Sequence, residues 1–170
     1  MIELIKSAVD YHYWRNARLL AKAAGLTSAE LYAPNLYPSG SLGGTFVHAM
    51  GADQLWTQRL LGDSPTTFAT PTAYPDLDSI VAKWRDVEAD FRSYVDGLTE
   101  AELMRHFTFR RINGDVVEAV VWETLVQVTN HGMQHGAEIA QMLTELGRSP
   151  GDIDFVAFTR ERDAHRKKQS

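Results

Sequence analysis

The sequence contains no cysteine. This absence excludes disulfide bonds, zinc sites built on cysteine thiolates, and catalysis by a cysteine nucleophile. If the protein carries out sulfur chemistry, the thiol must therefore come from a co-substrate.

Long apolar runs and basic charge are also scarce. No run approaches the ~20 residues of a membrane-spanning helix, and the start of the chain carries acidic Glu3 and lacks the apolar stretch of a signal peptide. We therefore expect a cytoplasmic protein without a membrane partner. Seventeen Lys and Arg against 22 Asp and Glu give a net charge of −5. This balance argues against a nucleic-acid partner, because such binding needs a concentrated basic face.

The remaining composition is that of an ordinary globular chain. Its 170 residues are 44% hydrophobic and 23% charged, which suits one domain with a sizeable core. We expect that domain over residues 1–160, followed by a basic, frayed tail over 161–170. Helical spacing of apolar residues predicts four long helices, at 2–24, 41–61, 76–96 and 120–147.

A different pattern precedes the last of these helices. Phe107 and Phe109 alternate with polar residues and are followed by Asn113-Gly114, a pair that favours the type I′ turn of a β-hairpin. The predicted fold is therefore all-α, a four-helix bundle with a short β-hairpin between helices three and four. Arg110 and Arg111 in this hairpin either meet an anionic substrate or protect a solvated strand edge by their charge.

The fourth predicted helix carries the most informative pair of residues. His131 and His135 lie one helical turn apart, so both imidazoles can reach the same point in space. A metal site is one interpretation, and two surface or hydrogen-bonded core histidines are the other. On spacing alone the second interpretation is the more frequent one.

His48, in the second predicted helix, is the candidate third ligand. It shares its side of the helix with Ala52 and Leu55, where a lone histidine is usually only a packed residue. Asp53 and Gln54 follow nearby and could accept hydrogen bonds from ligating histidines. His12 lies within an aromatic cluster, which we interpret as core packing, and we leave it out of the site.

Glu138 lies one turn beyond His135 on the side of the two histidines. It is our candidate catalytic residue, as a general base or as an additional ligand. The alternative is an acceptor that orients a ligating histidine.

Three segments carry a family resemblance: 11–20, 42–62 and 113–155. The last is the most specific, with Asn130-His131, His135 and the ending from Leu146-Gly147 to Asp154. The chain resembles the DinB-like (DinB/YfiT-like) family of metal-binding four-helix bundles. The resemblance implies an up-down-down-up bundle that forms a homodimer and holds a divalent metal on His48, His131 and His135.

The family often has His-Arg-Gly-Gln where this chain has His-Gly-Ala-Glu at 135–138. The change leaves the ligands intact and removes an arginine that could contact substrate. Three neutral imidazoles suit zinc, nickel, iron or cobalt and leave a coordination position open, as in catalytic zinc sites.

Characterised relatives include thiol-dependent S-transferases and isomerases. We therefore expect a divalent-metal-dependent enzyme with a three-histidine site, a thiol-dependent S-transferase or a related metal-assisted transferase or hydrolase. Its partners would be a small-molecule electrophile and a low-molecular-weight thiol. The alternative is a non-catalytic, stress-related bundle protein in which the metal has a structural role.

Overall fold

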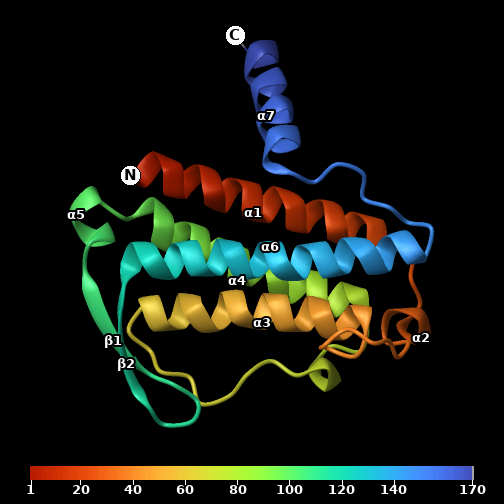
Figure 1. The fold of residues 1–170 in the computed structure, drawn as a ribbon, viewed down its shortest axis with the longest axis horizontal. Helices are drawn as coiled ribbons and strands as arrows, with labels where there is room; N and C mark the ends of the chain where they lie inside the picture. Colours follow the sequence, from red (N-terminus) through yellow and green to blue (C-terminus); the bar gives the residue numbers. More distant parts are fainter. Residues whose placement is uncertain (170) are drawn as a thin grey trace.

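Four long helices form the body of the protein in the computed structural model, which describes residues 1–169. Figure 1 shows that the first and last of them run in one direction and the middle two run in the opposite direction. The last helix packs against the first and second, and the third packs against the second. The predicted up-down-down-up bundle is confirmed, with helices α1 (Ile2–Ala23), α3 (Leu42–Leu60), α4 (Leu77–Asp96) and α6 (Val121–Glu145).

Local side-chain hydrogen bonds set where two of these helices begin. The Ser41 hydroxyl accepts a hydrogen bond from the Gly44 N–H at 2.9 Å at the start of α3. The Asp76 carboxylate accepts one from the Ser79 N–H at 2.8 Å at the start of α4. Both bonds satisfy N–H groups that have no partner within the helix, so Ser41 and Asp76 are the N-caps of α3 and α4.

The connections between the long helices contain short helical turns. Helices α2 (Ser28–Leu31) and α5 (Glu100–Leu103) each begin with a threonine capping box. The proline-containing linker between α3 and α4 holds the 3-10 turn η1 (Pro71–Ala73). This linker lies directly on α3, because a Cβ at Gly51 would be 2.8 Å from the Cβ of Ala69.

The predicted β-hairpin is present, but its predicted turn is wrong. Strands β1 (His106–Arg110) and β2 (Val116–Val120) pair antiparallel. A type I′ turn needs positive φ at both central residues, whereas within residues 1–169 positive φ occurs only at glycines, here at Gly114 with φ +96°. The Gly114 N–H donates to the Arg111 carbonyl at 2.9 Å. The Arg111 N–H donates to the Asp115 carbonyl at 2.7 Å and closes a three-residue loop, 112–114. Gly114 takes the left-handed position in this loop, and Asn113 does not.

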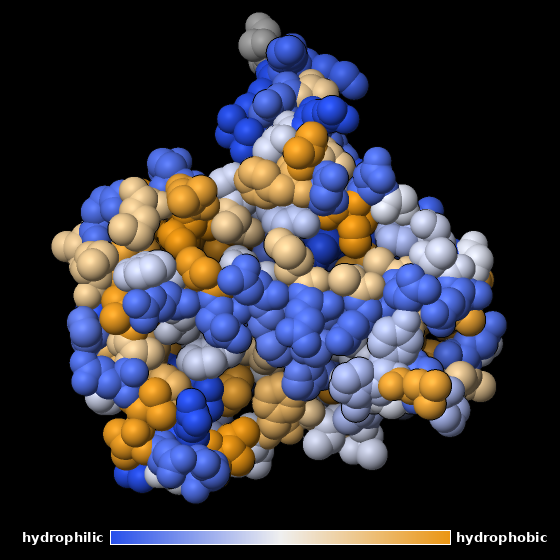
Figure 2. All heavy atoms as spheres, viewed as in Figure 1, coloured by the Kyte–Doolittle hydropathy of each residue, from blue (hydrophilic) through white to orange (hydrophobic). Residues whose placement is uncertain are grey.

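The C-terminal segment forms a helix, α7 (Phe155–Gln169), which was not predicted from the sequence. It projects from the bundle (Figure 1), and Figure 2 shows it largely hydrophilic, with apolar residues gathered at its base. Phe158 is 5% exposed, whereas Phe155 is 43% exposed and packs its ring against Tyr11 of α1, with 5.3 Å between the ring centres. Residues 161–169 of the predicted tail lie in this helix, and residue 170 lies outside the described residues. Fraying of the tail stays a prediction.

The core lies between the four long helices. Val121, Val128 and Ile139 on α6 are at most 1% exposed. Leu146 is 46% exposed, because α6 ends before it and Leu146 is only the C-cap residue. Within residues 1–169, no helix combines the length and the apolarity needed to cross a membrane.

Candidate metal centre

Helices α3 and α6 bring three histidines together. His48 comes from the first half of α3, and His131 and His135 come from successive turns of α6. One ring nitrogen from each lies within 4.8 Å of the others. The ring centre of His48 is 5.2 Å from that of His131 and 4.6 Å from that of His135. The structure therefore brings together the three residues that the sequence predicted as ligands.

The nitrogen spacing fits a shared cation. The Nε2 atoms of His131 and His135 are 3.2 Å apart. Two nitrogens bound to one tetrahedral zinc at ~2.0–2.1 Å lie ~3.3 Å from each other. Within residues 1–169, the group that could hold a metal consists of these histidines and includes no carboxylate. Such a donor set leaves room for a water or a substrate atom.

Glu138 lies beside this group and contacts one of its members. Its Oε2 atom is 2.7 Å from Nδ1 of His135, and the two side chains are 19% and 7% exposed. With Nδ1–H donating to the carboxylate, Nε2 of His135 keeps its lone pair for a metal. This geometry fits the orienting role of Glu138, while its catalytic role stays a prediction.

Burial and mutual repulsion lower the pKa values of His131 and His48 and so favour their neutral forms. Desolvation, followed by the neighbouring His135 and His48, lowers the pKa of His131 from 6.5 to about 4. Desolvation and His135 also lower the pKa of His48. The Nδ1 atom of His131 is buried without a protein partner. Neutral imidazole is the form that binds a metal, so these residues suit a cation at neutral pH.

A cavity of about 320 Å³ opens beside the cluster, a size within the lower range of small-molecule sites. His48 and His135 form its polar side, and Phe68 contributes a ring whose centre is 5.4 Å from that of His48. The two loops that flank α3 complete the wall with Pro38, Ser39 and Pro71. The cavity therefore combines an apolar wall with the imidazoles of His48 and His135.

Other residues considered from the sequence lie elsewhere. Asp53 does not accept from a ligating histidine, because its Oδ2 atom bonds His12 and Trp84. Arg110 donates to the Gly114 carbonyl at 2.7 Å within the exposed hairpin. His12, assigned to packing, is 1% exposed but makes polar contacts. The partners of Asp53 come from α1 and α4, so residue spacing within α3 could not identify them.

Comparison with known proteins identifies a family for this chain. No match was found among curated proteins. The profile of the DinB family matches residues 1–167, almost the whole chain. The chain therefore belongs to the DinB family.

Proposed function

We propose that this protein is a divalent-metal-dependent enzyme whose cation is held by His48, His131 and His135. The observation that carries the proposal is the meeting of three imidazole nitrogens within 4.8 Å, beside a cavity large enough for a small molecule. Zinc, nickel or iron suits such donors. The reaction proposed is the transfer of a low-molecular-weight thiol to a small electrophile.

The protein's own residues prepare the site for this reaction. A bound divalent cation would supply Lewis acidity, which lowers the pKa of a water or a thiol beside it. Glu138 accepts from His135 Nδ1–H and so holds the ring in the ligating orientation. Phe68 and Pro71 line the cavity with apolar surface, which displaces water from around a bound electrophile.

The absence of cysteine supports an external thiol. In the proposed reaction the thiolate sulfur forms a bond to an electrophilic carbon, the bond from that carbon to its leaving group breaks, and the thiol proton passes to solvent. The chain supplies no sulfur nucleophile of its own. A hydrolase, in contrast, would use water as its nucleophile and would need no thiol.

The metal centre is tested by metal analysis of the purified protein and its variants. His131→Ala should lose stoichiometric metal and keep its helical circular dichroism, because the ligand is removed and the core is not. His106→Ala is the matched control, since His106 is an exposed histidine of the hairpin. Full metal retention by His131→Ala would contradict the proposed centre.

The reaction is tested with 1-chloro-2,4-dinitrobenzene, with and without N-acetylcysteine. Turnover that needs both the thiol and the metal, above the uncatalysed rate and absent in His131→Ala, would support S-transfer. Turnover without the thiol would replace this assignment by hydrolysis. Bound metal without turnover of a panel of such electrophiles would favour the non-catalytic, structural role.

A further inference from the structure

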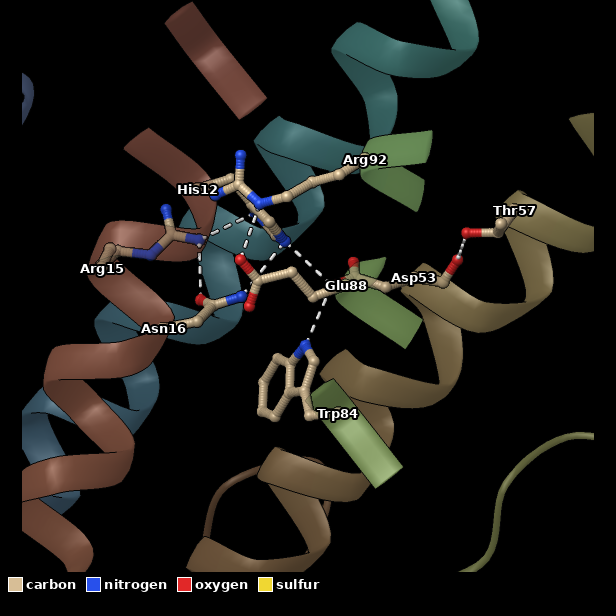
Figure 3. Close-up of polar contacts among 8 residues, drawn as sticks. All are labelled: His12, Arg15, Asn16, Asp53, Thr57, Trp84, Glu88 and Arg92. Carbon is tan, nitrogen blue, oxygen red and sulfur yellow. Dashed lines mark hydrogen bonds and ion pairs between the residues drawn. The ribbon is translucent and has the colours of Figure 1, made fainter. Parts of the chain in front are cut away.

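A second polar cluster lies at the centre of the bundle, apart from the three histidines. Figure 3 shows side chains of α1, α3 and α4 pointing toward one another there. His12, Arg15 and Asp53 are each 1% exposed. With Asn16 and Trp84, they form what we call the central network.

Hydrogen-bond directions in the central network follow from the chemistry of arginine. The Arg15 guanidinium can only donate, and its Nη2 atom lies 3.1 Å from Nδ1 of His12. Nδ1 is therefore the acceptor, and Nε2–H of His12 donates to Asp53 Oδ2 at 2.9 Å. The Trp84 indole donates to the same oxygen at 3.3 Å. The Nδ2 atom of Asn16 also lies 3.1 Å from Nε2 of His12. His12 therefore joins α1 to α3, and Asp53 joins α3 to α4.

The network also rests on the backbone of α6, at two glycines. A Cβ at Gly132 would overlap Cε1 of the His12 ring, and a Cβ at Gly136 would be 2.7 Å from Nε of Arg15. These glycines directly follow His131 and His135 in the sequence. One side of α6 therefore carries two candidate ligands, while the adjacent side touches the central network.

The position of Asp53 completes the connection. It lies on α3 five residues after His48, a rise of about 7.5 Å along the helix. His12 spans the space between Asp53 on α3 and Gly132 on α6. The two helices that bear the metal ligands are therefore held against the same imidazole.

Stability alone does not explain this network. Burying charged groups costs several kcal/mol per ion, and apolar replacements of buried ionic clusters are often neutral or stabilising. Arg15 is a costly member, because its Nε and Nη1 atoms are buried without a protein partner. Directional bonds, in contrast, select one register between helices where apolar side chains could slide.

We propose that His12, Arg15 and Asp53 are positioning residues that fix α3 against α6, so that His48 meets His131 and His135 at a common point. This inference rests on the proposed metal centre. It assigns a role in metal binding to residues that do not touch the cation.

The test compares cobalt(II) affinity and the cobalt absorption spectrum among folded variants. His12→Leu/Asp53→Leu removes the central bonds together, and we expect the Kd for cobalt to rise about tenfold or more, as for groups that orient metal ligands. The visible cobalt bands should also change, because the donors move. The single variant Asp53→Asn keeps an acceptor oxygen for His12 and should therefore keep most of the cobalt affinity.

Controls separate positioning from general loss of stability. Val95→Ala removes core volume near the far end of α4, so it should lower the melting temperature and leave the cobalt Kd and spectrum unchanged. If the double variant fails to fold, Gly132→Ala takes its place in the test. The added Cβ displaces the His12 ring, so this variant should weaken cobalt binding. Gly97→Ala is its control, because a Cβ there meets only ordinary contacts at 3.6 Å.

The possible results test the metal centre and the positioning role separately. Wild-type protein that takes up no cobalt would overturn the metal centre and with it this inference. Wild-type uptake, with an unchanged Kd and spectrum in the folded double variant, would overturn the positioning role alone. In the absence of a folded double variant, unchanged binding by Gly132→Ala would overturn it.

Discussion

At the scale of single residues, the metal centre depends on which nitrogen of each imidazole carries a proton. Glu138 fixes this choice for His135 by accepting from Nδ1 at 2.7 Å. No comparable acceptor fixes His131, whose Nδ1 atom is buried without a protein partner. The two histidines of α6 therefore contribute differently to the centre, although their spacing in the sequence makes them look equivalent.

Removal of the Glu138 carboxylate should weaken metal binding. Glu138→Ala leaves His135 free to rotate, and we expect the metal Kd to rise about 10- to 100-fold. Glu138→Gln keeps an acceptor oxygen and should lie between this variant and the wild type. Isothermal titration with zinc measures both. Normal metal binding with lost turnover in Glu138→Gln would instead assign Glu138 as the catalytic base.

The low pKa of His131 predicts an acid-sensitive metal-free protein. Its pKa is about 4 in the folded state and ~6.5 in an unfolded chain. The unfolded state therefore binds more protons between these values, so the free energy of unfolding should fall as the pH drops from about 6.5 to about 4. Urea denaturation across this range measures the fall. A slope that His131→Gln does not reduce would contradict the assignment.

The ligand residues were predictable from the sequence, whereas their surroundings were not. The spacing of His131 and His135 follows from helix geometry, and His48 was added as a histidine of the second predicted helix and by family resemblance. The bond between His12 and Asp53 joins residues 41 positions apart on two helices. No periodicity within one helix indicates such a pair, so the polar role of His12 needed the structure.

At the scale of elements, local signals located most helix boundaries. Ser41, Asp76 and Thr99 cap their helices as their residue types predict. The hairpin was also predictable, but its turn type was not, because Asn113-Gly114 fits more than one loop and the strand register decides between them. Helix α7 was missed because its basic second half resembles a solvated tail.

Phe158 should control the docking of α7 and not the stability of the bundle. Its ring lies 5.7 Å from Trp14 and 5.9 Å from Tyr11 of α1. Phe158→Ala removes these contacts, so we expect amide exchange in α7 to quicken about tenfold or more, while the rest of the bundle unfolds at nearly the same free energy. Hydrogen exchange read by mass spectrometry measures this difference.

Val156→Ala is the matched control for that variant. Val156 lies in the same helix but is 52% exposed, so its truncation should change exchange in α7 less. Equal effects of the two variants, or faster exchange throughout the bundle in Phe158→Ala, would contradict local docking.

At the scale of the whole molecule, metal binding should stabilise the fold. A ligand at 100 times its Kd adds about 2.7 kcal/mol to the free energy of unfolding, and each kcal/mol raises the melting temperature by about 2–4 °C for a chain of this size. Chelation should therefore lower the melting temperature by about 5–10 °C. His131→Ala should melt at one temperature with or without metal. An equal response of both proteins would contradict a specific site.

The bundle itself was predictable because four periodic segments of suitable length leave few other arrangements. Its direction pattern came from family resemblance, and the path of the linker over Gly51 came only from the structure. The homodimer expected from the resemblance stays a prediction for sedimentation to check.

The ligands of the proposed centre are widely separated along the chain. His48 precedes His131 by 83 positions, the difference between the two residue numbers. On the ribosome, a nascent chain that ends before α6 has only one of the three imidazoles and cannot enclose a cation. Retained metal would therefore mark molecules in which α6 has been made and has packed against α3.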